Sequence, residues 1–126
     1  MKNDSLNIEW MIHYCDAIID DVSTINGNIE LYLDDKTLQR SCSFSLLQIG
    51  EISKRVTEET KSKYSDVNWR AIAGLRDRIV HHYEPLSLYA LWDIIINDVP
   101  VLKESLLHIE KDLKSLSDSA SDVKHL

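Results

Sequence analysis

The sequence predicts an all-α protein, and three observations lead to that class. Only three glycines and two prolines occur in 126 residues, which is little material for the turns of an all-β fold. Apolar residues recur at alternating steps of three and four, the period of a helix with one buried face. Short polar segments separate four such stretches. We therefore expect an antiparallel, up-and-down four-helix bundle in one domain over residues 1–116, followed by a polar tail over residues 117–126.

The first expected helix covers residues 5–24, with Ser5 as a suitable N-cap. Gly27 follows it and can take the left-handed conformation that ends a helix. Residues 29–33 fit either a short helical turn or an extended connector. The buried stripe of this first helix is expected to consist of Ile8, Met11, Cys15, Ile18, Val22 and Ile25.

The second expected helix covers residues 36–59, and the aspartates at positions 34 and 35 are suited to cap it. Phe44, Leu46 and Leu47 lie off its main stripe. Contact with a partner chain would explain them, and so would a position between three helices. The stripe itself is expected to consist of Leu38, Cys42, Ser45, Ile49, Ile52 and Val56.

The third expected helix follows a polar linker over residues 60–66 and runs over residues 69–82. Asp66 or Asn68 can cap its start. Pro85 cannot lie inside a continued helix, so the helix is expected to end just before it.

The fourth expected helix starts after Ser87, a suitable cap, and keeps its apolar alternation as far as Leu116. Pro100 interrupts this stretch and has no amide hydrogen to donate to the carbonyl of Ile96. We therefore expect a kink at Pro100.

The two cysteines and the N-terminal residues indicate the compartment. Cys15 and Cys42 lie within apolar helical stripes, which favours buried free thiols of a reducing compartment over a disulfide. No apolar segment of a secretory signal follows residues 1–4, and no run approaches the ~20 apolar residues of a membrane span. We expect a cytoplasmic protein with no membrane partner.

The charge distribution is uneven. A formal net charge of −7 argues against broad nucleic-acid binding. Residues 54–82, however, hold seven basic and four acidic side chains, a net charge of +3, against −10 for the remainder. This pattern fits a local phosphate site, and chance clustering on a solvated face explains it equally well.

Residues 76–83 carry the side chains best suited to chemistry. A guanidinium such as that of Arg76 binds phosphate oxygens through a paired fork, and an imidazole such as that of His81 can take a proton from a ribose 2′-hydroxyl near neutral pH. This chemistry requires no metal or cofactor. Basic residues in a last helical turn also stabilise the helix by about 0.3–1 kcal/mol without any function. Neighbouring His81 and His82 point about 100° apart on a helix, so no metal site is expected.

The same residues carry a resemblance to a known family. The segment RDRIVHHY at residues 76–83 matches the R-x4-H-x-Y signature of the HepT-like (DUF86) HEPN ribonuclease toxins. Residues 47–51 (LQIGE), 69–76 (WRAIAGLR) and 91–102 also resemble corresponding family segments. The resemblance extends over about residues 8 to 116.

The resemblance implies a HEPN four-helix bundle that forms a homodimer with a composite active site. It implies metal-independent endoribonuclease activity on RNA, in a type VII-like toxin–antitoxin system. It also implies an MNT-type nucleotidyltransferase antitoxin that silences the toxin by AMPylation of the motif tyrosine, Tyr83. By position it assigns catalysis to Arg76 and His81, assisted by Asp77. From charge, the candidate RNA-binding residues are Lys54, Arg55, Arg70, Arg78 and His82. The alternative is a non-catalytic HEPN module that binds a nucleotidyltransferase or a nucleotide.

Overall fold

Every element in the part of the chain that the structure describes is helical. The computed structural model describes residues 3–81 and 85–124, with side chains for residues 3–79 and 88–117. In chain order the elements are α1 (Asp4–Ser23), α2 (Ile29–Leu33), α3 (Lys36–Ser53), α4 (Glu58–Lys63), α5 (Trp69–Ala73), α6 (Leu75–His81), α7 (Pro85–Asp93), the π-helical turn η1 (Ile94–Asp98) and α8 (Val99–Lys124). The predicted all-α class is confirmed.

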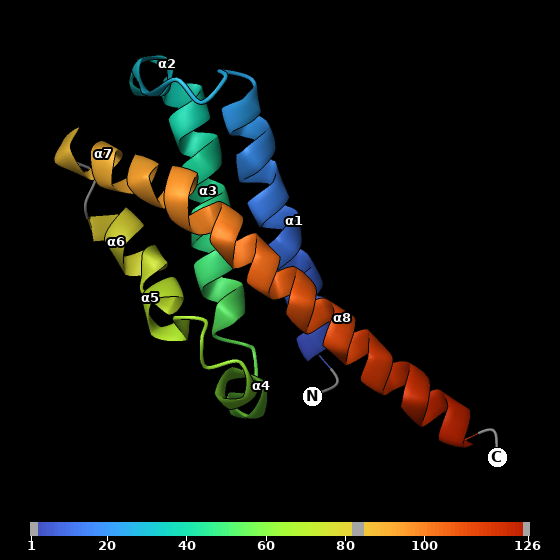
Figure 1. Cartoon of the computed structure of the whole chain (residues 1–126). Helices are drawn as coiled ribbons and strands as arrows, with labels where there is room; N and C mark the ends of the chain where they lie inside the picture. Colours follow the sequence, from blue (N-terminus) through green and yellow to red (C-terminus); the bar gives the residue numbers. More distant parts are fainter. Residues whose placement is uncertain (1–2, 82–84, 125–126) are drawn as a thin grey trace.

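The core lies where three long helices meet. Helices α1 and α3 lie side by side, α8 crosses them diagonally, and α5 and α6 pack against α3 (Figure 1). The predicted stripes of α1 and α3 supply much of the buried surface, and α8 adds Leu106 and Ile109. Whether this packing forms a regular up-and-down bundle stays a prediction.

Both cysteines belong to this core. Cys15 and Cys42 are fully buried free thiols, as predicted. Burial, followed by the nearby Asp16 and Asp21 carboxylates respectively, raises the pKa of each thiol to about 12. Because the thiolate is the reactive form, neither cysteine is a candidate nucleophile.

The start and end of α1 show one wrong and one confirmed prediction. The N-cap predicted at Ser5 is wrong, because α1 already begins at Asp4 and the amide of Asn7 donates to the Asn3 carbonyl at 2.9 Å. After the helix, Gly27 has a φ of +67°, the left-handed conformation expected there. Residues 29–33 form the short helix α2, which resolves the open alternative.

The expected second helix over residues 36–59 is wrong in its last quarter. It begins as predicted, since Asp35 accepts a hydrogen bond from the amide of Leu38 at 3.0 Å. It ends at Ser53, because Thr57 adopts an extended ψ of 153° and becomes the N-cap of α4. Helix α4 therefore occupies part of the segment expected to be a polar linker.

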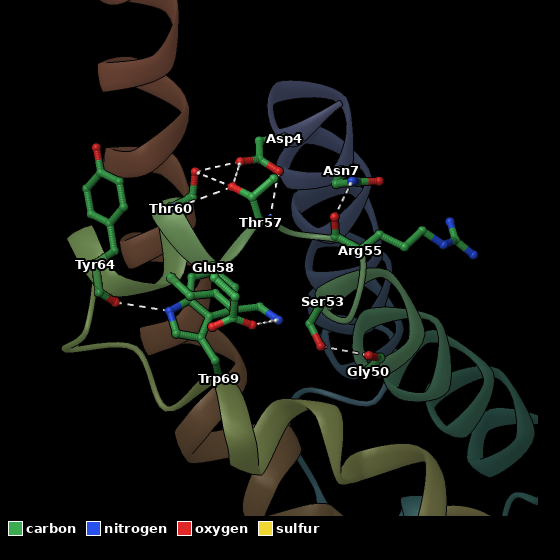
Figure 2. Close-up of polar contacts among 11 residues, drawn as sticks. Asp4, Asn7, Gly50, Ser53, Arg55, Thr57, Glu58, Thr60, Tyr64 and Trp69 are labelled. Atoms are coloured by element: carbon green, nitrogen blue, oxygen red, sulfur yellow. Dashed lines mark hydrogen bonds and ion pairs between the residues drawn. The ribbon is translucent and has the colours of Figure 1, made fainter. Parts of the chain in front are cut away.

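A buried carboxylate from α1 holds this break in place (Figure 2). Asp4 is 1% exposed and accepts from the Thr57 amide at 3.0 Å, the Thr57 hydroxyl at 2.6 Å and the Thr60 hydroxyl at 2.5 Å. Burial alone would raise the pKa of the Asp4 carboxyl, but these hydrogen bonds hold the pKa below its ordinary value. The break is thus a tertiary feature that the local pattern does not encode.

The expected third helix is interrupted. Asn68 caps its start, accepting from the Ala71 amide at 3.1 Å, as one of the two predicted caps. Gly74 ends α5, and α6 begins at Leu75 and runs to His81. The segment is therefore two short helices and not one.

The fourth helix starts earlier than expected and contains a different irregularity. Helix α7 begins at Pro85 and not after Ser87, because proline is well suited to the first turn of a helix. The π-helical turn η1 lies shortly before Pro100, and in it the Val99 amide donates to the Ile94 carbonyl; the kink expected at Pro100 stays a prediction. A π-helical turn of this kind widens the helix locally and so accommodates a missing hydrogen bond.

Candidate functional site

A close contact between helices places the candidate site. A Cβ atom on Gly50 of α3 would lie 3.0 Å from the carbonyl oxygen of Ile72 and 3.4 Å from the amide nitrogen of Arg76. Only a glycine lets the backbones of α3 and the α5–α6 segment approach this closely. The next residue of α3, Glu51, is thereby brought beside Arg76.

Arg76 is held by carboxylates from two helices. Glu51 Oε1 lies 3.2 Å from Arg76 Nε, and Asp77 Oδ1 lies 3.5 Å from Arg76 Nη1. Lys54 Nζ lies 3.3 Å from the same oxygen of Glu51. The Arg76 side chain remains 49% exposed. A guanidinium that is oriented and still open to solvent is suited to receive a phosphate.

The charges of this cluster are balanced in the free protein. Two cations, Arg76 and Lys54, face two carboxylates, Glu51 and Asp77. Exposed ion pairs contribute little to stability, about 0–1 kcal/mol each, so an incoming phosphate can compete with the more exposed of them. That is Asp77, whose side chain is 67% exposed.

The predicted base lies at the end of α6. His81 is the last residue of that helix, and its side chain lies outside the described residues. On a regular helix the positions of Arg76 and His81 are about 140° around the axis and about 7.5 Å along it from each other. A long arginine side chain spans part of that separation. His82 and Tyr83 also lie outside the described residues, so the roles of all three stay predictions.

The predicted RNA-binding residues are distributed over several faces. Lys54 shares the Glu51 carboxylate with Arg76, which brings it to the candidate site. Arg55 lies in the turn after α3, where its side chain extends away from the Asp4 cluster (Figure 2), and Arg70 is exposed on α5. Arg78 is two residues beyond Arg76 and therefore about 160° around α6.

Arg78 lines a groove on that other side of α6. The groove has a volume of about 350 Å³ and lies between the α5–α6 segment and η1–α8. Apolar residues such as Ile49, Ile72 and Leu102 line it, together with the polar Asp98. Arg76 is not part of its lining, so the groove and the Arg76 cluster are separate features.

A second surface of interest is an exposed aromatic face on α1 and α3, formed by Leu6, Trp10, His13, Tyr14 and Phe44. Trp10 is 48% and Phe44 56% exposed, and both rings lie 6.1 Å from that of Tyr14. Phe44 is one of the three off-stripe residues of the second expected helix. The other two behave differently, because Leu46 is buried in the core and Leu47 packs against it.

Nowhere within residues 3–81 and 85–124 do three or more His, Cys, Asp or Glu side chains gather in an arrangement that could hold a metal ion. In the same part of the chain, no helix combines the length and hydropathy needed to cross a membrane.

Glu51 is the site residue that the sequence reasoning missed. The segment around it was noted only for its resemblance to a family segment. The signal was present in Gly50, because a glycine inside a helical pattern marks a packing or functional constraint. The glycine predicts a close approach, but the sequence does not say which helix approaches.

These observations define the class of the protein as an all-α, HEPN-like helical domain with an ion-paired arginine at its surface. The comparison with protein families specifies the class further. The chain belongs to the ribonuclease HepT-like family, which matches it over residues 8–109.

Curated relatives support the same assignment. A candidate RNase of Methanocaldococcus jannaschii is 36% identical over 89 residues, which cover 71% of this chain and 74% of that protein. A candidate RNase of Caldanaerobacter subterraneus subsp. tengcongensis is 31% identical over 86% of this chain and 96% of its own length. The probable ribonuclease HepT of Thermococcus cleftensis is 32% identical over 65% of this chain and 74% of its own length. No solved structure matches the chain at a significant level.

Proposed function

We propose that this protein is a metal-independent endoribonuclease and the toxin of a type VII-like toxin–antitoxin pair, acting on RNA in the cytoplasm. The observation that carries the proposal is the half-exposed Arg76, held by Glu51 in a chain of the ribonuclease HepT-like family. The relatives named above as RNases support the same substrate class.

The reaction uses the nucleophile of the RNA itself. His81 removes the proton from a ribose 2′-hydroxyl, and the 2′-oxygen forms a bond to the adjacent phosphorus. The bond from phosphorus to the 5′-oxygen breaks, and that oxygen takes up a proton as it leaves. Arg76 stabilises the negative charge that gathers on the phosphoryl oxygens, and Asp77 orients the guanidinium. Lys54 supplies a second phosphate contact at the same site.

Regulation is proposed at Tyr83. An MNT-type nucleotidyltransferase transfers AMP from ATP to the phenol oxygen, with release of pyrophosphate and the phenol proton. Tyr83 is seven residues beyond Arg76, which on a continued helix is about 20° away on the same face. The added phosphate would be a competing anion for Arg76. Intact-mass measurement after co-expression with such an enzyme is expected to show AMP on the wild type and none on Tyr83→Phe.

The active form is proposed to be a homodimer with a composite site. The aromatic face favours this, because Phe44 lies seven residues before Glu51 on α3, hence on the same side and about 10.5 Å along the axis. A second copy bound there comes close to Arg76. Sedimentation is expected to show a dimer for the wild type and a weaker one for Phe44→Glu. Leu31→Glu, at a comparably exposed position on α2, serves as the control.

The decisive experiment measures RNA cleavage in the presence of EDTA. The wild type and the control Lys111→Ala, which removes an exposed lysine of α8, are expected to cleave. Arg76→Ala and His81→Ala are expected to lose at least about 100-fold in rate, the size typical of a lost acid–base or charge-stabilising group. Equal cleavage by all four would refute the assignment of Arg76 and His81, and no cleavage by any of them would leave the non-catalytic module.

A further inference from the structure

The contacts of Arg76 with its two carboxylates are not equivalent. Asp77 is the neighbour of Arg76 on α6, so its contact lies within one helix and orients the guanidinium only relative to α6. Glu51 belongs to α3, a long helix whose other side forms part of the core. Glu51 is also the closer and less exposed partner, at 3.2 Å and 33% against 3.5 Å and 67%.

The position of Glu51 on α3 is itself well determined. At Gly50, directly before it, the backbones of α3 and the α5–α6 segment are in contact. The Ser53 hydroxyl donates to the Gly50 carbonyl at 2.7 Å, which reinforces the last turn of α3 (Figure 2). The carboxylate of Glu51 therefore projects from a fixed base toward Arg76.

The atom that Glu51 contacts determines what the contact can do. A guanidinium is planar, and its five N–H donors have a fixed geometry. The Glu51 carboxylate oxygen, 3.2 Å from Nε, holds the plane at its inner end and leaves the terminal nitrogen pair to face a phosphate. Lys54, at 3.3 Å from the same carboxylate oxygen, offsets the negative charge of Glu51 at this point.

We propose that Glu51 is a positioning residue of the ribonuclease site, which orients the guanidinium of Arg76 toward the scissile phosphate through the contact of its carboxylate with Nε. The inference rests on the proposed function. It assigns to Glu51 no contact with RNA, because a carboxylate would repel the phosphate.

The kinetic consequence has a distinctive form. In Glu51→Ala the guanidinium is released, and displacement of a catalytic group by about 1 Å can cost on the order of 100-fold in rate. Removing a negative charge also favours binding of a polyanion. We therefore expect kcat to fall about 10- to 100-fold while KM for RNA stays equal or decreases. A loss of folded protein would instead lower the apparent kcat of every destabilised variant to a similar extent.

Conservative variants separate the contact at Nε from the charge of the carboxylate. Glu51→Gln keeps an acceptor oxygen at the same reach and is expected to stay within about fivefold of the wild-type kcat. Glu51→Asp keeps the charge but is one methylene shorter, and is expected to resemble Glu51→Ala. The matched control is Glu110→Gln on α8, which removes one negative charge from an ion pair with Lys114 and is expected to behave as wild type.

A measurement without RNA tests the positioning directly. The NMR signal of the Arg76 Nε–H group is expected to exchange slowly with solvent in the wild type and in Glu51→Gln. In Glu51→Ala and Glu51→Asp it is expected to exchange at least about tenfold faster, with thermal melting recorded to confirm that each variant is folded.

The outcomes distinguish the two proposals. Should wild type and Arg76→Ala have equal nuclease activity, the proposed function fails, and with it the kinetic role of Glu51. The positioning role alone is overturned if Arg76→Ala is inactive while Glu51→Ala keeps its kcat within twofold of wild type. It is equally overturned if Glu51→Gln and Glu51→Ala lose the same activity, or if the Arg76 signal exchanges at one rate in every variant.

Discussion

Replacing Gly50 with alanine tests the helix contact on which the candidate site is built. The added methyl group would lie 3.0 Å from the Ile72 carbonyl oxygen and 3.4 Å from both the Arg76 amide nitrogen and the Leu75 Cβ. The first distance is shorter than ordinary van der Waals contact, and the atom it meets belongs to a helix backbone. The α5–α6 segment must therefore move away from α3.

Two opposing terms set the magnitude. Alanine is more favourable than glycine inside a helix by about 0.8–1.0 kcal/mol. Overpacking of a close contact costs typically about 1–3 kcal/mol. The net expectation is destabilisation by about 1 kcal/mol, or a decrease of Tm by about 3–5 °C for a chain of this length. Gly74→Ala is the control, since its Cβ would meet its nearest atom at 3.4 Å and its φ of −74° suits any residue.

The assay is urea unfolding of both variants, followed by circular dichroism, together with RNA cleavage. Gly50→Ala is expected to unfold at lower urea concentration and to lose nuclease activity, because the shift of α6 separates Arg76 from Glu51. Gly74→Ala is expected to be as stable as wild type, or more stable by up to about 1 kcal/mol. If Gly50→Ala gains as much stability as Gly74→Ala does, the contact between α3 and α6 has room for a methyl group. The claim that this contact requires a glycine would then be refuted.

Two more predictions concern the buried polar contacts. Asp4→Ala leaves the Thr57 amide and two hydroxyls without their acceptor, so its free energy of unfolding is expected to fall by about 3 kcal/mol in urea titrations. The pKa of Asp4 in the folded protein is lowered from 3.8, so the contribution of Asp4 to the free energy of unfolding is present above pH 3.8 and is lost as the pH falls further. The stability of the wild type should therefore fall more steeply with acid than that of Asp4→Ala. Tyr64 donates to Asp112 at 2.7 Å, and burial followed by that carboxylate raises the pKa of the phenol from 10.0 to about 12. The stability that follows from this raised pKa is present below pH 10 and is lost towards pH 12. Tyr64→Phe is therefore expected to lose less stability than the wild type over that range. An identical loss in both proteins would contradict the role given to the Tyr64–Asp112 contact.

Much of the fold could be predicted because helical burial is a local pattern. The stripes of α1 and α3 are periodic within single stretches, and residues such as Ile8 and Ile49 are buried wherever those helices pack. The caps at Asp35 and Asn68 and the left-handed Gly27 depend on neighbours within three residues, so they too could be predicted. Arg76, His81 and Tyr83 were identified by a motif, whose spacing is again local.

The errors arose where distant residues decide the backbone. The expected helix over residues 36–59 has no local stop signal strong enough to end it at Ser53. It ends there because Asp4, 53 positions before Thr57, supplies the buried acceptor that the extended Thr57 requires. The cost of burying a carboxylate without donors is large, so the tertiary contact overrides the helical propensity of the segment.

The sequence by itself thus determined the helical class, the buried faces and the basic segment that carries the arginine. Only the tertiary structure decided which carboxylate meets that arginine, because Glu51 and Arg76 are 25 positions apart and come together through the packing at Gly50. Periodicity fixes the direction of a side chain on its own helix. The distance between two helices depends on the volume of the residues between them, and here that volume is the missing side chain of a glycine.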